Sequence, residues 1–327
     1  MSATQTLTPS MKRQRRADLR RNVFYLALIA VGLVAPFVAY PVFLMKVLCF
    51  ALFACAFNLL LGYAGLLSFG LAAFLATGGY VTGYLLSSHP ALTPELGILA
   101  GTLAAVALGA VFGALSIRRQ GIYFAMVTLA LAQMMYFFFV QVPFTGGEDG
   151  LHGVPRGELF GVISLRSNLA MYYFVFAIFL FGFAIIQRAV HSPYGQVLKA
   201  IRENEPRAVS LGYNVDAYKW VAFVLSAGLA GLAGSTKTLV FQLASLTDAH
   251  WHMSGEVILM TLLGGVGTLF GPVVGAGIVV SLQHLLAQSP LGNWVDVILG
   301  IIFVLCVLSF RSGIVGEILK SYRKNFK

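Results

Sequence analysis

The stretch VLCFALFACAFNLLLGYA, from Val47 to Ala64, carries no charged residue. An α-helix needs about 20 apolar residues to cross a hydrocarbon layer of about 30 Å. Runs of similar length recur from Val23 to Phe310, and 58% of the 327 residues are hydrophobic while only 10% are charged. Soluble domains have about 45–50% apolar and about 25% charged residues. The sequence therefore predicts an all-α, polytopic integral membrane protein.

The net charge of +10 is explained by where the basic residues lie rather than by a nucleic-acid partner. Lys and Arg gather in 12–21, at 118–119, in 188–219 and in 311–327, each group beside a hydrophobic run. Segments rich in Lys and Arg stay on the cytoplasmic side of a membrane. We therefore expect both basic tails, 1–22 and 311–327, to be cytoplasmic, with membrane lipid as a partner and no nucleic acid.

About ten membrane crossings fit this distribution of charge. They are expected at 23–45, 47–64, 68–88, 95–116, 121–142, 169–187, 219–241, 253–266, 268–287 and 294–310. The predicted membrane domain is thus 23–310. It contains a periplasmic loop at about 143–168 and a charged cytoplasmic segment at about 188–216.

Two glycine-rich segments predict breaks in these helices. The run 253–266 would be only about 21 Å long as a helix, which is too short to span the bilayer. LGYAGLLSFGLAAF (61–74) and LGGVGTLFGPVVGA (263–276) also form a faint internal repeat. Glycine-interrupted segments that recur in two halves are typical of a transport path. The alternative, that these glycines only allow helices to pack closely, is equally compatible with the sequence.

Motifs of an energy source or an active site are scarce. GLAGSTKT (231–238) differs from a P-loop, since its Lys does not follow a Gly and the segment is apolar. The three cysteines and the His-Trp-His run at 250–252 form no metal-ligand pattern, so we expect no metal site and no cofactor bound by this chain. Lys46, Glu95, Glu256 and Asp296 fall near predicted span ends, and Lys237 is expected to extend its amine to the interface. This distribution of charge argues against a mechanism driven by protons or sodium.

The charged segment HSPYGQVLKAIRENEPRAVSLGY (191–213) predicts two short helices. Ser192 is a good N-cap and Pro193 suits the first helical position, while Asn204 can cap a second helix that ends at Gly212. An apolar face is formed by Tyr194, Val197, Leu198 and Ile201. This face fits the membrane surface and a protein partner about equally well.

Four ordered motifs resemble the LivM-type permeases of branched-chain amino acid ABC importers. They are GYAGLLSFGLAAFLATGGY (62–80), TGGEDGLHGVP (145–155), SPYGQVLKAIRENEPRAVSLGYNVDAYKWVAFVLSAGLAGLAG (192–234) and GEVILMTLLGGVGTLFGPVVGA (255–276). The resemblance covers nearly everything from Leu44 to Gly316. It departs from the family at Leu71, where a His is common, and the segment 205–212 fits the coupling pattern of other ABC importers poorly.

The resemblance implies uptake of Leu, Ile and Val across the bacterial inner membrane by alternating access. The implied partners are two ABC ATPase subunits, which bind the ATP and Mg²⁺, a second, LivH-like permease, and a periplasmic substrate-binding protein. By the same resemblance, coupling to the ATPase is expected of Ser192, Pro193, Gly195, Ala200, Ile201, Arg202, Glu203, Asn204, Ala208 and Gly212. The translocation path is expected to be bordered by Gly65, Leu66, Ser68, Phe69, Gly70, Gly146, Gly147, Gly264, Gly265, Gly267, Gly271 and Pro272.

Three other functions remain open. A permease of the same family that carries urea or short amides would share every motif. A stand-alone secondary transporter or channel would need no ATPase partner. A membrane enzyme is less well supported, because no catalytic cluster is present.

Overall fold

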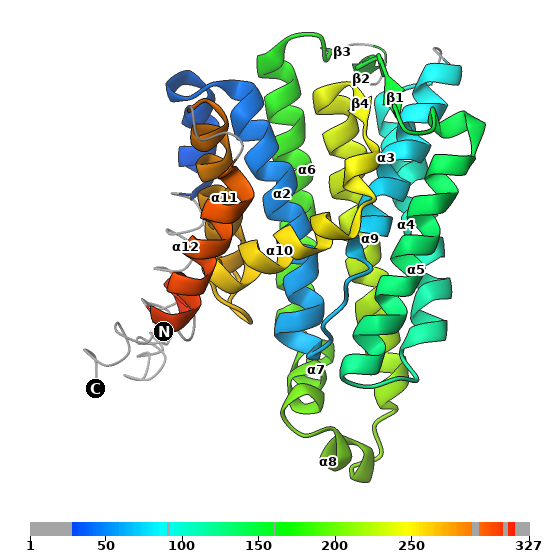
Figure 1. The fold of residues 1–327 in the computed structure, drawn as a ribbon, viewed down its shortest axis with the longest axis vertical. Helices are drawn as coiled ribbons and strands as arrows, with labels where there is room; N and C mark the ends of the chain where they lie inside the picture. The colour runs from blue at the N-terminus through cyan, green and yellow to red at the C-terminus, as the bar shows by residue number, and fades with distance from the viewer. Residues whose placement is uncertain are drawn as a thin grey trace, which may run out of the picture.

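The computed structural model describes residues 28–89, 92–159, 161, 163–289, 294–309 and 313–317. Its helices confirm the all-α prediction (Figure 1). Beyond the first described helix, Leu28–Val38, they are α2 (Pro41–Asn58), α3 (Leu71–Ser88), α4 (Pro94–Ser116), α5 (Ile122–Gln141), α6 (Asn168–His191), α7 (Pro193–Glu203), α8 (Glu205–Ser210), α9 (Val215–Phe241), α10 (Trp251–Gly264), α11 (Gly271–Ala287) and α12 (Val295–Ser309). The predicted tail 1–22 and most of 311–327 lie outside the described residues.

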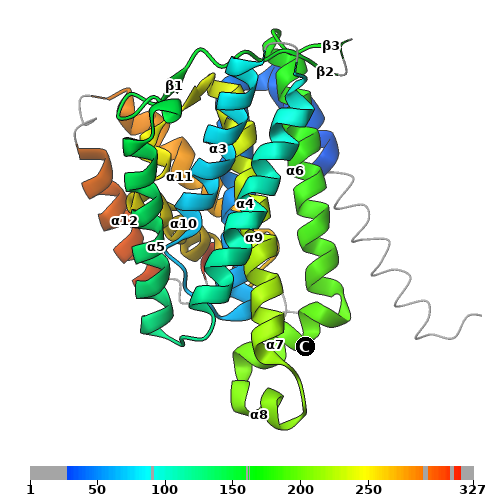
Figure 2. The same cartoon turned by 90° about the vertical axis from the view of Figure 1, so that its right-hand side faces the viewer.

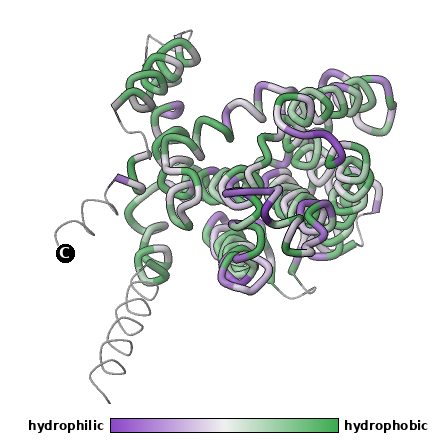
Figure 3. Tube along the Cα trace, turned by 90° about the horizontal axis from the view of Figure 1, so that it is seen from below, coloured by the Kyte–Doolittle hydropathy of each residue, from purple (hydrophilic) through white to green (hydrophobic). Residues whose placement is uncertain are grey.

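Five of the described helices are long and apolar enough to cross a membrane, so the chain is a multi-pass membrane protein. They are α2 with its π-helical extension η1 (Leu59–Ala64), α4, α5, α6 and α9. Figure 3, which views the bundle from the end that carries α7 and α8, shows hydrophobic residues along most of the trace. The exposed side chains of these helices are largely apolar, as lipid contact requires.

Some predicted bounds are wrong. The first break comes just before Pro41 and not at Lys46, because proline is well suited to the first turn of a helix. Lys46 therefore lies inside α2. The third and ninth crossings begin three residues later than expected, at Leu71 and Gly271, because the glycine-rich segments before them are not helical.

The two ends of the bundle differ. At one end α7 and α8 project beyond the long helices, and we call this the α7–α8 end (Figures 1 and 2). The opposite end, here the loop end, is covered by the connection between α5 and α6. That connection holds η2 (Pro143–Thr145), β1 (Leu151–His152), β2 (Glu158–Leu159) and β3 (Ile163–Ser164). β1 pairs with β4 (Leu243–Ala244), which follows α9, and β2 pairs with β3, both in antiparallel fashion.

The centre of the bundle is formed by α3, α4 and α9, whose backbones approach closely at glycines. A Cβ atom on Gly234 of α9 would overlap the carbonyl oxygen of Leu75 of α3, and one on Gly78 would overlap that of Gly231. Small residues permit this approach and so allow extensive van der Waals contact between membrane helices. The segment that resembles a P-loop is thus the packed middle of α9.

This packing makes a prediction for Gly234→Ala. The added methyl group meets backbone that cannot turn aside, so we expect a loss of about 1–3 kcal/mol in the free energy of unfolding. Gly277→Ala in α11 is the matched control, because its Cβ would meet only Val47 at 4.0 Å and alanine favours a helix. Thermal unfolding of the detergent-purified protein measures both. Equal midpoints for the two variants would contradict the packing argument.

Candidate functional site

The segment between α6 and α9 forms two capped helices, as the sequence predicted. The Ser192 hydroxyl accepts a hydrogen bond from the Gly195 amide at 3.4 Å, and the Asn204 side chain accepts one from the Arg207 amide at 3.1 Å. Pro193 begins α7, and Gly212 leaves α8 with a φ of +86°, which a residue with a side chain rarely adopts. These local signals define a compact pair of short helices, which we call the α7–α8 helix pair.

The apolar face of α7 packs against this chain itself. Leu198 and Ile201 are buried, and Ile201 clusters with Ala208 and Val215. The Tyr194 ring stacks on Tyr218 of α9 at 5.5 Å between centroids, and its hydroxyl donates to the Tyr218 carbonyl oxygen at 2.9 Å. Burial, with a smaller contribution from Tyr218, raises the pKa of the Tyr194 hydroxyl. The sequence did not decide whether the apolar face of α7 contacts the membrane surface or a protein partner. In the structure this face instead anchors α7 to the rest of the chain.

Gly195 lies where α7 meets the end of α6. A Cβ atom there would overlap the carbonyl oxygens of Val190 and Ala189. Ala200 and Glu203, by contrast, are exposed on the outer side of α7. The predicted coupling residues therefore divide into those that anchor the α7–α8 helix pair and those that face away from the bundle.

Arg202 reaches from α7 to both glycine-rich segments. Its guanidinium donates to the carbonyl oxygen of Gly62, in the π-helical end of the α2 helix. A Cβ atom on Gly65 would lie 3.0 Å from the Arg202 Cγ atom, and one on Gly267 would lie 3.1 Å from its Nη1 atom. Both glycines also have positive φ angles. A predicted coupling residue and predicted path residues thus meet in one place, which we call the junction.

Asn58 completes the junction by joining the two glycine-rich segments. Its side-chain amide donates to the Thr268 carbonyl oxygen at 2.8 Å, and its Oδ1 atom accepts from the Gly267 amide at 2.8 Å. Irregular backbone at membrane depth has no water to bond, so its polar groups need partners within the protein. The sequence analysis did not single out Asn58, although it is the one strongly polar residue in the opening stretch.

An ion pair beside the junction fixes the start of α8 to α9. The Lys219 amine lies 2.7 Å from Glu205 Oε1, and Gln120 in the turn between α4 and α5 donates to the same oxygen at 3.0 Å. A cavity of about 150 Å³ lies among these groups, Gly65 and Arg202. Glu205 therefore links α8, α9 and the α4–α5 turn. Sequence reasoning missed this role, because it depends on contacts between distant segments.

The broken segment before α3 is held by serine and threonine side chains. Ser254 of α10 donates to the Phe69 carbonyl oxygen at 2.7 Å and accepts from the Ala72 amide at 3.1 Å. The Phe69 amide donates to Thr128 at 3.2 Å, and the buried Ser68 hydroxyl accepts from the Gly70 amide. The predicted break is present, and its backbone is satisfied by α5 and α10.

The remaining predicted path residues fall into two places. A Cβ atom on Gly264 would overlap the Gly271 carbonyl oxygen, so α10 and the start of α11, including Pro272, pack tightly. Gly146 and Gly147 instead form a turn at the loop end, after η2, with φ angles of +78° and +62°. They are separate from the junction.

Charged residues that the sequence placed at span ends gather around α10. This short helix crosses the middle of the bundle, between α11 and α3 (Figure 1). The amine of Lys237 pairs with the carboxylate of Asp248, in the turn η3 (Leu246–Asp248), and the two side chains are only 16% and 10% exposed. The expectation that Lys237 extends to the interface is therefore wrong, because a carboxylate meets its amine within the protein.

Lys46 and Glu256 belong to the same region. The amines of Lys46 and Lys237 lie 6.0 and 5.2 Å from the centre of the buried Phe50 ring. Glu256 accepts a hydrogen bond from Gln283 at 3.0 Å, and its side chain is 15% exposed. Glu95 does lie in the first turn of α4, as expected, whereas the side chain of Asp296 lies outside the description.

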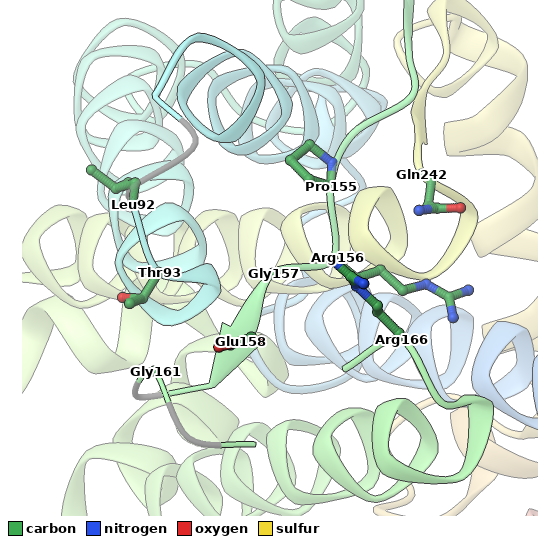
Figure 4. A pocket seen from close by; sticks show the side chains of 9 residues that line it. All are labelled: Leu92, Thr93, Pro155, Arg156, Gly157, Glu158, Gly161, Arg166 and Gln242. Carbon is green, nitrogen blue, oxygen red and sulfur yellow. The ribbon is translucent and has the colours of Figure 1, made fainter. Parts of the chain in front are cut away.

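The largest described cavity, of about 660 Å³, lies at the loop end (Figure 4). It is bordered by the residues before α4, the β2 region and Gln242 at the end of α9. Arg156 on its wall donates to Asn168 at 3.0 Å and to the Val240 carbonyl oxygen at 2.8 Å, and burial lowers the pKa of its guanidinium. These bonds fasten the loop to α6 and α9.

Comparison with known proteins identifies the group to which this architecture corresponds. Residues 40–307 match the family model described as branched-chain amino acid transport system, permease component. The chain belongs to this family. The permease is 25% identical to the high-affinity branched-chain amino acid transport system permease protein LivM of Salmonella typhimurium, over 83% of this chain and 69% of that protein. It is 27% identical to LivM of Escherichia coli K12, over 70% of this chain and 59% of that protein.

Other relatives extend this comparison. LivH of Escherichia coli K12 is 23% identical over 82% of the permease and 91% of its own length. The nucleoside ABC transporter permease protein NupC of Lactococcus lactis is 29% identical over 56% of the permease and 65% of its own length. No solved structure matches the chain significantly. The relatives are transport components and not enzymes, and one of them is named for a different cargo.

The junction yields a prediction for Asn58→Ala. This change removes the side-chain partner of the part-buried Gly267 amide and Thr268 carbonyl oxygen, so the free energy of unfolding should fall by about 1–3 kcal/mol. Asn214→Ala is the matched control, because it removes only an exposed helix cap and should cost about 1 kcal/mol. Thermal unfolding measures both. A smaller loss at position 58 than at position 214 would contradict the role of Asn58.

Proposed function

We propose that the permease is the membrane-spanning subunit of an ATP-binding cassette importer that carries Leu, Ile and Val across the bacterial inner membrane. The observation that carries this proposal is the contact of Arg202 with both glycine-rich segments. Through this contact, a movement of the α7–α8 helix pair can be transmitted directly to the breaks in the membrane helices. The relatives named LivM support the cargo.

The proposed orientation places the α7–α8 end in the cytoplasm, together with both termini, since basic residues gather there in the sequence. The loop end then faces the periplasm and receives cargo from a substrate-binding protein. Two ATPase subunits hold the ATP and Mg²⁺, and a LivH-like permease completes the membrane unit. The chain itself binds no cofactor in this proposal.

The mechanism assigned to this chain is alternating access. When the ATPase subunits close, they move α7 and α8 together, because Ile201 of α7 packs against Ala208 of α8. Arg202 transmits the movement to Gly62 and Gly267. Segments with positive-φ glycines can rearrange without side-chain strain, so the path opens to one side and closes to the other.

Reconstitution tests this function. Vesicles that contain the permease with its ATPase, second permease and binding-protein partners should take up labelled leucine only when ATP is supplied, and excess isoleucine or valine should compete. Competition by urea or uridine instead would identify the other cargoes of this family. Uptake by the permease alone, without ATPase subunits, would support a secondary transporter or channel and contradict the proposal.

Arg202→Ala tests the coupling role of Arg202 in this assay. The ATPase subunits should still bind and hydrolyse ATP, while leucine uptake per ATP falls about tenfold or more, because the link to Gly62 and Gly267 is cut. Arg118→Ala removes an exposed arginine from the turn that follows α4 and should leave uptake unchanged. Normal leucine uptake by the Arg202 variant would contradict the proposed role of Arg202 in coupling.

Docking of the ATPase yields a second prediction. Val209 and Leu211 are 57% and 69% exposed, and with Tyr213 they form an apolar surface at the tip of α8, beyond the long helices (Figure 2). Sequence reasoning missed this surface because it followed the apolar face of α7. Exposed apolar residues that project from a membrane domain mark a protein contact.

Leu211→Asp should therefore prevent co-purification of the ATPase subunits with the permease, since it buries a charge in the contact. Ile163→Asp at the loop end changes an equally apolar residue that is 52% exposed, and should leave the complex intact. Co-purification in detergent measures both. Retention of the ATPase by the Leu211 variant would show that it docks elsewhere.

A further inference from the structure

A small cavity lies beside the charged residues in the middle of the membrane domain. It has a volume of about 330 Å³, is bordered by α10 and α12, and is lined among others by Phe69, His252, Glu256, Leu259, Leu299 and Phe303. This volume is at the lower end of the range for small-molecule sites. Its wall is apolar except for Glu256 and His252. The cavity thus combines one carboxylate with aliphatic and aromatic side chains.

Glu256 has capacity for a further hydrogen-bond donor. A carboxylate can accept about four hydrogen bonds, and Gln283 supplies one to Oε1. The His252 Nδ1 atom is 4.0 Å away, beyond hydrogen-bond distance. An acidic side chain inside a membrane domain is costly unless it has a function or a cationic partner.

Two lysines, Lys46 and Lys237, lie near Glu256 without forming a salt bridge with it. Lys237 is paired with Asp248, and Lys46 has no carboxylate within 4.0 Å among the described residues. Neither lysine therefore occupies the Glu256 carboxylate, which lines the cavity.

The cavity also touches the predicted path. Phe69, on its wall, belongs to the broken segment before α3, and its carbonyl oxygen is bound by Ser254, two residues before Glu256 on α10. A movement of the glycine-rich segment therefore changes the shape of the cavity. This places the carboxylate next to the part of the backbone that the junction controls.

We propose that this cavity is a transient binding site for the zwitterionic cargo, in which Glu256 binds the ammonium group and Leu259, Leu299 and Phe303 surround the branched side chain. The proposal rests on the proposed function, since it assumes that an aliphatic amino acid is carried. The carboxylate of the cargo needs a hydrogen-bond donor, and a ring nitrogen of His252 on the same wall can supply one.

The first test uses Glu256→Gln in the reconstituted complex. The amide keeps the size of the side chain and removes its charge, so leucine uptake at low concentration should fall about 10- to 100-fold, while assembly and ATP hydrolysis persist. Glu317→Gln, at an exposed site after α12, is the matched control and should transport normally. If the wild type and the Glu256 variant take up leucine equally well, the proposed binding site is wrong while the proposed function stands. No uptake by wild type contradicts the proposed function instead.

A second measurement does not depend on transport. In the assembled complex, with the three native cysteines of the permease changed to alanine, the Leu259→Cys variant is treated with cationic and anionic methanethiosulfonate reagents. The introduced thiol should react faster with the cationic reagent, and Glu256→Gln should abolish this preference. L-Leucine should slow the reaction, whereas 4-methylpentanoate, which lacks the ammonium group, should not. Equal protection by both compounds, or by neither, overturns the proposal.

Discussion

A backbone that leaves its helix inside a membrane must find every hydrogen-bond partner in the protein, and this constraint governs the permease. Two glycine-rich breaks carry the unsatisfied groups. Asn58 binds the amide of Gly267 and the carbonyl oxygen of Thr268, and Arg202 binds that of Gly62. Ser254 performs the same task before α3. The side chains that satisfy the breaks come from other helices, so the breaks tie the bundle together.

The same requirement explains how a peripheral element can act on the membrane interior. Arg202 belongs to α7, yet it satisfies backbone at the end of α2. A hydrogen bond to irregular backbone is costly to leave unmade, so movement of α7 must carry that backbone along or supply it with another partner. Because Tyr194 and Ile201 anchor α7 within the protein, the α7–α8 helix pair can transmit a movement, which a flexible loop could not do.

Local chemistry made much of this predictable. Composition predicted the membrane fold, and Ser192, Asn204 and Gly212 predicted two short helices, because caps and left-handed turns depend on neighbouring residues only. The resemblance pointed to Arg202, but its contacts join residues 140 apart in the chain, and no local pattern encodes them. The role of Glu205 was missed for the same reason.

The charges show most clearly what a linear reading leaves out. Lys46 and Glu256 were placed at span ends, and Lys237 was expected to reach the interface, because only the distance of each residue along the chain from a predicted span end was considered. In the structure α10 lies across the bundle, so Glu256 and Asp248 come close to α2 and α9. The argument against an ion-driven mechanism assumed that deep charges were absent, and it loses that support. The case for an external source of energy now rests on the family and on the junction, where a projecting helix pair contacts glycine-containing backbone from both halves of the repeat.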